Sequence, residues 1–519
     1  MRYKRILEGT LLASLLMALS LPVHAGAYYF VDAGTRGMAR GGAYVAGNRD
    51  ITAQYYNPAA LINLESGQIM LNFSLVDQSA AFTRMDLDED GDIDKTYRKV
   101  DNIAAPMKIP SFGIAHHFGL PNTMFAIGLH PPYAPDKEYT ATSAQRYTLI
   151  DAKVTQFYTG ISAAHQPLPW LTIGASLLWN MTAANQELAI NVCNGYEGVS
   201  DEPQSCTASG RKETDLIIAM MMKDPGKLTG NFGLLIDPHE QVSIGLSVMP
   251  PISVSGKGTL QAEFSEEHWL YTSNFIEERK TKDNDITVEL TMPWVIRGGI
   301  AFRPIRNLEI EFATVYERWR TTKETLVTDV SAPLVLTDFI TGLAQLDETV
   351  PINGPVRIPQ KYRDSVSYRL GGEWDANPSV SVRTGVYYER SAIPDKNMGV
   401  SLMDGNKVGY GIGFSYHLVQ AKKILSFDIG FSQSFLGTRK IRNSELRQLQ
   451  VPIDLNEAIQ NAIQANINGE SVDGALSTKI GRGPVVGNGD ISSTLTMMSA
   501  GVTYYFGKPT KRTHNLERH

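Results

Sequence analysis

The sequence lacks an uninterrupted apolar run of about 18 residues, the length that a membrane-spanning helix needs. The apolar stretch from Leu11 to Leu21 follows a basic start and precedes Val23-His24-Ala25. This order is typical of a secretory signal peptide, with cleavage expected after Ala25. We therefore expect residues 1–25 to be a signal peptide and the mature chain not to be a helical membrane protein.

Cysteine is nearly absent. Cys193 and Cys206 are the only two, and they lie 13 positions apart in a stretch that contains Gly, Ser and Pro. A chain of 519 residues with two cysteines is not a small disulfide-stapled module. In an exported protein we expect them to form one local disulfide in a loop, and a reactive pair is the alternative.

An excess of basic charge is also missing, since 48 basic side chains stand against 54 acidic ones. This balance does not indicate the basic surface that a nucleic-acid-binding protein needs. The chain has no Walker sequence, and its ten histidines form no motif with serine or carboxylates. We expect no required cofactor and no enzyme activity.

What the sequence has is strict alternation. In residues 425–431, Leu425, Phe427, Ile429 and Phe431 alternate with Ser426, Asp428 and Gly430. Side chains on a strand alternate between faces, so the segment has one apolar face and one polar face. Fourteen segments carry this pattern, near 67–83, 109–119, 123–134, 152–166, 170–191, 227–237, 240–263, 287–303, 308–325, 362–376, 378–390, 407–420, 424–438 and 493–506.

The connections between these segments alternate between short turns and long loops. Leu120-Pro121-Asn122 and Asp237-Pro238-His239 are two of the short turns, and the intervening connections run to tens of residues. An even number of strands with this loop pattern indicates a transmembrane β-barrel with its short turns and both termini on the periplasmic side. The predicted fold class is all-β, a 14-stranded antiparallel transmembrane β-barrel over residues 67–506, with residues 507–519 as a periplasmic tail.

The predicted inward face carries many charged side chains. Strand parity places acidic residues in the lumen together with Arg297, Arg363, Arg369 and Arg383. One interpretation is a salt-bridged, hydrated wall. The other is that one or two of these arginines bind a ligand carboxylate, for which a guanidinium offers two donors.

Residues 26–66 do not alternate and are rich in Gly, Ala and Asn. Glycine lets a backbone pack closely in a confined space, so we expect a plug, or hatch, inside the lumen. Its candidate packing residues are Gly37, Gly41, Gly42, Asn57, Pro58 and Ala59. The aromatic residues Tyr28 and Phe30 are expected to fill or line an interior pocket.

The glycine-rich run followed by Asn57-Pro58-Ala59 resembles the hatch of the FadL/TodX family of outer-membrane transporters for hydrophobic compounds. Further matches, in order along almost the whole mature chain, are Pro293-Trp294, Tyr316-Glu317-Arg318-Trp319, Tyr368-Arg369, Arg383-Thr384-Gly385 and Ser391-Ala392-Ile393-Pro394-Asp395. The resemblance implies capture of a ligand in a groove of extracellular loops, transfer to a lumen pocket and sideways release near a kinked third strand.

In this chain the third strand contains His130-Pro131-Pro132. Proline cannot donate to a sheet ladder, so Pro131 and Pro132 predict either such a kink or simply the end of the strand. The C-terminus departs from the family pattern, because Tyr504-Tyr505-Phe506 is followed by a basic tail.

Two loops are candidates for the capture groove. The third long loop is expected to hold an apolar, methionine-rich run, and methionine suits a promiscuous apolar surface. The fourth adds aromatic residues, although packing of loop against loop is the alternative. The groove candidates are Leu216, Ile217, Ile218, Met220, Met221, Trp269, Leu270 and Phe275.

The first long loop contains a run of acidic residues with one glycine. Asp86, Asp88, Asp90 and Asp94, with Gly91, match the first part of a calcium-binding loop, but Tyr97 stands where the last ligand would be. We expect either a weak Ca²⁺ site or a solvated acidic hairpin.

The sequence therefore predicts a monomeric protein in the outer membrane of a Gram-negative bacterium, in contact with outer-membrane lipid, that passively transports hydrophobic small molecules. The family resemblance implies long-chain fatty acids as the expected cargo. The alternatives are a channel for aromatic hydrocarbons or alkanes, a lipase-like barrel hydrolase, and a plain diffusion porin, which would not need a hatch.

Overall fold

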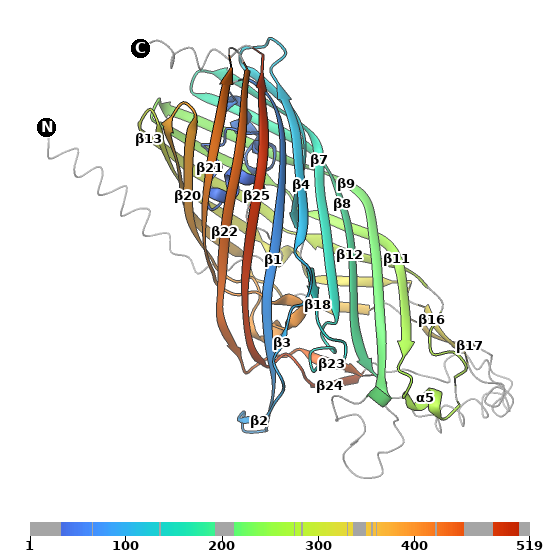
Figure 1. Cartoon of the computed structure of the whole chain (residues 1–519). Coiled ribbons are helices and arrows are strands. Elements are labelled where there is room, and N and C mark those ends of the chain that lie inside the picture. The colour runs from blue at the N-terminus through green and yellow to red at the C-terminus, as the bar shows by residue number, and fades with distance from the viewer. Residues whose placement is uncertain are drawn as a thin grey trace.

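The computed structural model of the chain describes residues 33–64, 66–133, 136–192, 212–274, 276–281, 284–329, 331–335, 349–353, 356–359, 361–420, 423–450 and 481–507. Strands dominate these residues and wind into a closed, tilted cylinder (Figure 1). Within these ranges, no helix has both the length and the apolarity required to span a bilayer.

The wall is an antiparallel barrel in which each strand pairs with its neighbours along the chain. Its uninterrupted strands are β1 (Gly67–Leu87), β4 (Met107–His116), β5 (Thr123–Tyr133), β7 (Asp151–Leu168), β8 (Leu171–Asn191), β9 (Asp215–His239), β20 (Val380–Glu389), β21 (Lys407–Gln420), β22 (Lys423–Ile441) and β25 (Gly489–Phe506). The barrel closes where β1 pairs with β25, from Gly67 opposite Phe506 to Arg84 opposite Gly489.

Four further spans are each divided into two segments. They are β10 (Val242–Met249) with β11 (Ile252–Phe264), β12 (Asn284–Met292) with β13 (Trp294–Ile305), β14 (Leu308–Arg318) with β15 (Glu324–Thr328), and β18 (Val356–Pro359) with β19 (Ser365–Asn377). Pro250 and Pro251 separate the first two segments, and Pro293 separates the next two. Proline has no N–H for the ladder, which explains these breaks. With the ten uninterrupted strands, the four divided spans make fourteen, and the predicted 14-stranded barrel is confirmed.

The two ends of the barrel differ. Short turns connect β4 to β5, β7 to β8, β9 to β10 and β13 to β14 at the end that lies at the top of Figure 1. The long connections gather at the other end. They contain the short elements β2 (Ile93–Thr96), β3 (Val100–Asp101), β6 (Asp136–Glu138), η3 (Lys212–Thr214), α5 (Trp269–Thr272), η4 (Trp319–Thr321), β16 (Ser331–Val335), β17 (Thr349–Asn353), η5 (Asp395–Asn397), η6 (Val400–Leu402), β23 (Arg447–Gln450) and β24 (Gly481–Val485).

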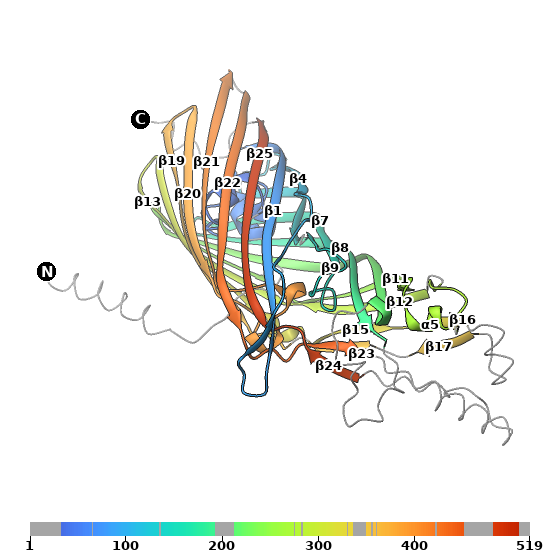
Figure 2. The same cartoon turned by 60° about the horizontal axis from the view of Figure 1, so that its bottom comes forward.

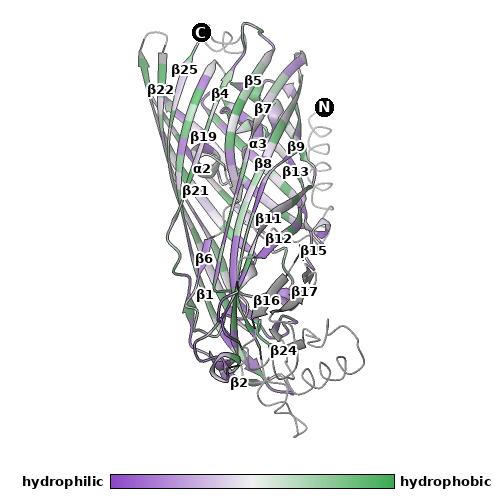
Figure 3. Cartoon of the chain, turned by 90° about the vertical axis from the view of Figure 1, so that its right-hand side faces the viewer, coloured by the Kyte–Doolittle hydropathy of each residue, from purple (hydrophilic) through white to green (hydrophobic). Residues whose placement is uncertain are grey.

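The alternation of the sequence becomes the two faces of the wall. On β22, Phe427 and Ile429 are 42% and 60% exposed on the outside, whereas Asp428 between them is buried. On β1, Leu71, Phe73 and Leu75 are likewise exposed. In Figure 3 green and purple residues alternate along the strands, as an apolar exterior over a polar interior requires.

One predicted boundary is wrong. The run 215–222 was expected in a loop, but it forms the first third of β9, paired with β8 on one side and β11 on the other. Alternate residues of this run are buried, as in a strand. The sequence does not show this alternation, because both faces of the run are apolar and three methionines follow one another. As Figure 2 shows, this part of β9 extends beyond the cylinder together with β11 and β12. We call this projection, which carries α5, the wing.

Residues 33–64 lie inside the ring of strands. They form α2 (Thr35–Ala39), α3 (Ala53–Tyr56) and η1 (Pro58–Asn63), drawn in blue behind β22 and β25 in Figure 1. Helix α2 contacts β20, β21 and β22, and η1 contacts β7, β8 and β9 on another side of the barrel. Because one short segment touches both sides, it occupies the lumen. We call residues 33–64 the internal segment.

Candidate functional site

The internal segment is held by the Asn57-Pro58-Ala59 motif. Asn57 Oδ1 accepts the Ala59 N–H at 3.1 Å, which caps η1, and Pro58 suits the first turn because it has no N–H to satisfy. The Asn57 amide also donates to the carbonyl of Val45 at 3.0 Å and to that of Leu234 on β9 at 3.1 Å. The motif thus fixes the turn and ties it to the wall.

Glycines on the inner wall let the segment approach the strands. A Cβ added at Gly385 on β20 would lie 2.0 Å from the carbonyl oxygen of Arg40, and one at Gly174 on β8 would lie 2.2 Å from the nitrogen of Ala59. Both distances are impossible for real atoms, so these positions require glycine. The polar faces of the sequence showed many glycines, but nothing in a single strand reveals which other segment packs on it.

Ion pairs join the segment to the wall. Arg36 Nε lies 3.1 Å from Asp428 Oδ1. Arg40 Nη1 lies 2.9 Å from Glu309 Oε1, and Arg40 Nη2 lies 3.4 Å from Glu311 Oε2. Glu311 also accepts the backbone N–H groups of Val45, Ala46 and Gly47. All these charged groups are buried, where a carboxylate and a guanidinium need each other.

Three of the four predicted lumen arginines are buried in the lumen. Arg383 lies 2.7 Å from Glu373, and Arg369 lies 3.7 Å from Glu389. The guanidinium of Arg297 lies 4.5 Å from the ring centroid of Tyr55 in α3, a cation–π contact. The prediction for Arg363 is wrong: it precedes β19 and its side chain is exposed. Tyr28 and Phe30 lie outside the described residues.

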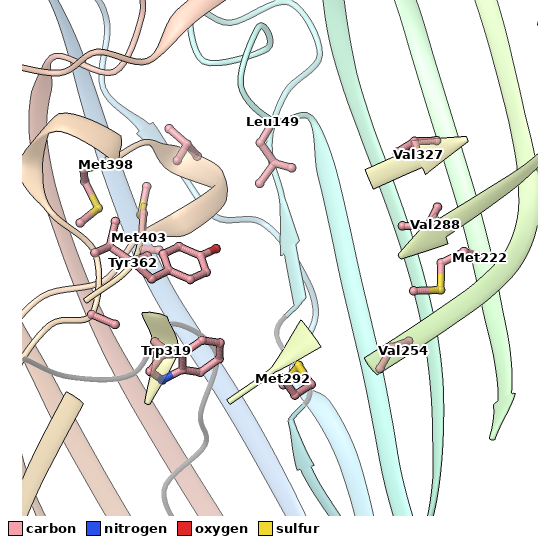
Figure 4. Packing of buried hydrophobic residues seen from close by; sticks show 14 of the residues in the cluster. Leu149, Met222, Val254, Val288, Met292, Trp319, Val327, Tyr362, Met398 and Met403 are labelled. Carbon is pink, nitrogen blue, oxygen red and sulfur yellow. The ribbon is translucent and has the colours of Figure 1, made fainter. Parts of the chain in front are cut away.

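A continuous cluster of buried apolar side chains runs from the internal segment to the wing. It begins at Tyr44, Tyr55 and Tyr56 and reaches Phe264 and Leu270 beside the long loops. Between these ends, Figure 4 shows Met292 and Trp319 with Met398, Met403 and Tyr362 on one side and Met222, Val254, Val288 and Val327 on the other. Four of the ten labelled side chains are methionines, whose unbranched chains adapt to different neighbours.

Five of the eight predicted capture residues belong to this cluster or pack against it, and these five do not form an open groove. Leu216 and Ile218 on β9 and Leu270 on α5 are buried in it, and Met220 and Trp269 pack against it. Ile217 packs against a smaller cluster, and Met221 on the other face is 53% exposed. Phe275 lies outside the described residues. In this region, α5 of the loop packs against the β9 part of the sheet, which is the alternative to an open groove.

His268 fixes the start of α5. Its Nδ1 accepts the N–H of Leu270 at 3.2 Å. Burial lowers the pKa of His268 to about 4, so the ring is neutral and can accept at neutral pH. The indole N–H of Trp269 donates to the carbonyl of Val192 at 2.8 Å, which ties α5 to the end of β8.

The barrel wall is interrupted beside the third strand. Strand β5 pairs with β4 only from Phe112 opposite Leu129 to His116 opposite Phe125. On its other side the register with β7 shifts between His130 and Tyr133, where Pro131 and Pro132 lie. A cavity of about 470 Å³ opens at this break, lined among others by Ala104, Met107, Ile109, Pro131, Lys153 and Phe157.

The lining of this cavity includes residues from both faces of the wall. Lys153 and Phe157 occupy alternate, outward positions on β7, whereas Met107 and Ile109 occupy inward positions on β4. Met107 and Ile109 pack against a small cluster of Met38, Val76 and Met497, and Met38 belongs to the internal segment. We call this feature the wall gap.

The predicted calcium and disulfide sites receive no support. Asp86 accepts hydrogen bonds from Arg84 and Tyr97, and Asp88 accepts the Asp92 N–H. Asp90 lies in the exposed turn between β1 and β2, and Asp94 is an exposed residue of β2. Across the part of the chain that the structure describes, no group of three or more His, Cys, Asp or Glu is placed to hold a metal ion. Cys193 and Cys206 lie outside it.

A closed, even-numbered barrel with an apolar exterior belongs to the class of outer-membrane β-barrel proteins. The profile of the family described as outer membrane protein transport protein (OMPP1/FadL/TodX) matches residues 16–476. The chain belongs to this family, and its location is the outer membrane of a Gram-negative bacterium.

Similar proteins agree with this assignment. The chain is 23% identical over 255 residues to a 47 kDa outer membrane protein of Pasteurella multocida, a match that spans 49% of this chain and 52% of that relative. It is 20% identical to an outer membrane protein of Neisseria meningitidis serogroup B, over 76% of this chain and 84% of that one.

Solved structures share the fold. The crystal structure of a Pseudomonas aeruginosa FadL homologue has a TM-score of 0.67 at 14% identity and covers 93% of this chain and 100% of its own. The Pseudomonas putida toluene transporter TodX has a TM-score of 0.55 at 15% identity, over 92% and 98% of the two chains. At these identities the likeness concerns the fold.

Proposed function

We propose that this protein carries hydrophobic small molecules passively across the outer membrane. The observation that supports this most is the single apolar, methionine-rich cluster that runs from the wing beside the long loops to the tyrosines of the internal segment. Burial of apolar surface stabilises by about 25 cal/mol per Å², so such a path attracts apolar molecules from water. The family membership points the same way.

The proposed route begins at the outer end of β9 and at α5. There Leu216, Ile218 and Leu270 form an apolar base, and a ligand displaces side chains from it rather than entering an open groove. Methionines along the way can change rotamer at low cost. The ligand then reaches Tyr55 and Tyr158, whose ring centroids lie 6.4 Å apart in the lumen.

The proposed exit is sideways. The internal segment serves as a hatch, because it fills the lumen and is bonded to strands on both sides of it. The wall gap offers the other way out, and its inner residues Met107 and Ile109 are apolar. A hydrophobic molecule that leaves there enters the bilayer directly.

Long-chain fatty acids remain the first candidate cargo, on the family resemblance. A specific observation favours the second candidate, uncharged hydrocarbons: Arg369 and Arg383 already contact Glu389 and Glu373. A ligand carboxylate would have to compete with these wall carboxylates. Among the similar structures, TodX is described as a toluene transporter.

The test uses purified protein in detergent and in liposomes. Binding of labelled oleate, oleyl alcohol and toluene is compared on the same preparation, with hydrolysis of a fatty-acid ester and efflux of a trapped sugar as controls. Binding of one or more of the three without hydrolysis supports the proposal, and their order of affinity identifies the cargo. Ester hydrolysis would indicate a barrel hydrolase, and rapid sugar efflux a diffusion porin; either result overturns the proposal.

A further inference from the structure

A buried histidine marks the edge of the wall gap. His130 on β5 is the last residue that keeps register with β7 before the shift, where it lies opposite Tyr158. Its side chain is fully buried on the lumen side. Among the described residues, its Nδ1 has no hydrogen-bond partner, so its polar contact is made through Nε2.

The partner comes from the internal segment. His130 Nε2 lies 3.2 Å from Oε1 of Gln54, a fully buried residue of α3. The amide nitrogen Nε2 of Gln54 donates to the carbonyl of Gly160 on β7 at 2.7 Å. Since that nitrogen is the donor, Oε1 is the acceptor and His130 Nε2 carries the proton. One amide therefore joins the two strands that lose register.

The position of this amide is set from both sides. A Cβ added at Gly128 on β5 would lie 2.6 Å from Gln54 Oε1, so the wall makes room for the amide. The backbone carbonyl of Gln54 accepts the hydroxyl of Ser176 at 2.9 Å and the amide of Asn231 at 3.3 Å. In Figure 3, α3 lies in the lumen near β7 and β8, and it contacts β5 and β8.

We propose that Gln54 is a positioning residue through which the internal segment sets the width of the wall gap. Its amide holds β5 at His130 and β7 at Gly160, directly before Pro131 and Pro132 interrupt the pairing. Movement of α3 breaks both hydrogen bonds and releases the end of β5. The internal segment and the gap in the wall are thereby one mechanical unit, whatever molecule passes through.

The test measures access to the gap without any transported ligand. Ala105, exposed and lining the gap, is replaced by Cys in the full chain, with Cys193 and Cys206 replaced by Ser. The rate of labelling by a lipid-soluble maleimide in liposomes is then compared among variants. Gln54→Leu and His130→Leu are each expected to change the rate at least fivefold, and the double variant by no more than the larger single change.

Two further variants keep the outcome interpretable. Gly128→Ala leaves both polar side chains in place but displaces the amide, and the same change in rate is expected. Thr35→Val removes the hydrogen bonds of α2 to Asn72 and Ser499 of the wall and leaves α3 and the Gln54 amide untouched, so a change below twofold is expected. Each variant is first shown to fold by its heat-modifiable migration on gels. Equal effects of Gln54→Leu and Thr35→Val, or effects of Gln54→Leu and His130→Leu that multiply in the double variant, would overturn the proposal.

Discussion

Arg40 of the internal segment and Glu309 of β14 form an ion pair of 2.9 Å between residues 269 positions apart in the chain. Both side chains are buried, and Arg40 also reaches Glu311 at 3.4 Å. Charges taken out of water are stable only when paired, so this contact selects one position of the segment in the lumen. The first prediction follows from it.

Replacing Arg40 by Met is expected to destabilise the seating of the segment strongly. Loss of one partner leaves buried carboxylates without their counter-charge, and such a change costs about 3–5 kcal/mol. The expected result is a leak of sugars and ions through proteoliposomes, at least tenfold above the parent protein. Arg49→Met is the control, because Arg49 also contacts Glu309 but is 31% exposed. A leak that is equal in both variants would show that the buried pair has no special part in closing the lumen.

The second prediction concerns the close approach of backbone to wall. Gly385→Ala places a methyl group 2.0 Å from the Arg40 carbonyl oxygen, so the segment or β20 must move. Overpacking of this kind costs about 1–3 kcal/mol, and we expect a lower unfolding midpoint and faster sugar leakage. Gly298→Ala on β13 is the matched control, since its Cβ would meet only Thr314 Cγ2, at an ordinary 3.7 Å. If both variants unfold at the same denaturant concentration, the close packing inferred here is incorrect.

The sequence predicted the barrel because the residues of each strand alternate between apolar and polar according to the face on which they lie. Phe427 and Ile429 face the outside and Asp428 the inside, and this alternation is local information. The same parity correctly placed Arg297, Arg369 and Arg383 inside. The alternation rule misplaced Arg363, because β19 begins at Ser365. Residues before the strand do not alternate between its two faces.

Contacts between distant segments were not predictable in this way. Glu309 and Asp428 could be assigned to the lumen by parity, yet nothing nearby in sequence identified Arg40 and Arg36 as their partners. The wing was missed for a related reason. The side chains from Ile217 to Met222 are apolar on both faces of the strand, and they range from buried to exposed. A run of this kind shows no alternation of apolar and polar residues, so its sequence does not indicate a strand.

The third prediction tests the wall gap as an exit. Ala104→Trp introduces a large ring into the cavity of about 470 Å³, which Ala104 lines. We expect uptake of the hydrophobic cargo into cells to fall at least fivefold, while binding in detergent stays within twofold. Ile161→Trp, on the lipid-facing side of β7 where Ile161 is 56% exposed, is the control and should leave both unchanged. Normal uptake by Ala104→Trp would exclude the gap as the exit.

The fourth prediction is a pH dependence of stability at the mouth of the barrel. Lys137 of β6 is buried and its Nζ donates to the carbonyls of Val400 and Ser401, at 3.5 and 3.3 Å. Burial lowers the pKa of Lys137 to about 8; Asp404 opposes this shift and Lys407 adds to it. Between pH 8 and the ordinary lysine pKa the unfolded chain binds more protons than the folded one, so stability rises with pH across this window and is constant below it.

At pH 7 the lowered pKa of Lys137 therefore corresponds to a cost to the folded state of up to about 3 kcal/mol. Lys137→Met is expected to remove the rise in unfolding free energy between pH 8 and 10.5. Denaturant unfolding in detergent at a series of pH values measures it. Lys153→Met is the control, because Lys153 is half exposed and bonded to Asp136, and its pH profile should follow the parent protein. A rise that persists unchanged in Lys137→Met would assign the pH dependence to another group, since the methionine side chain does not titrate.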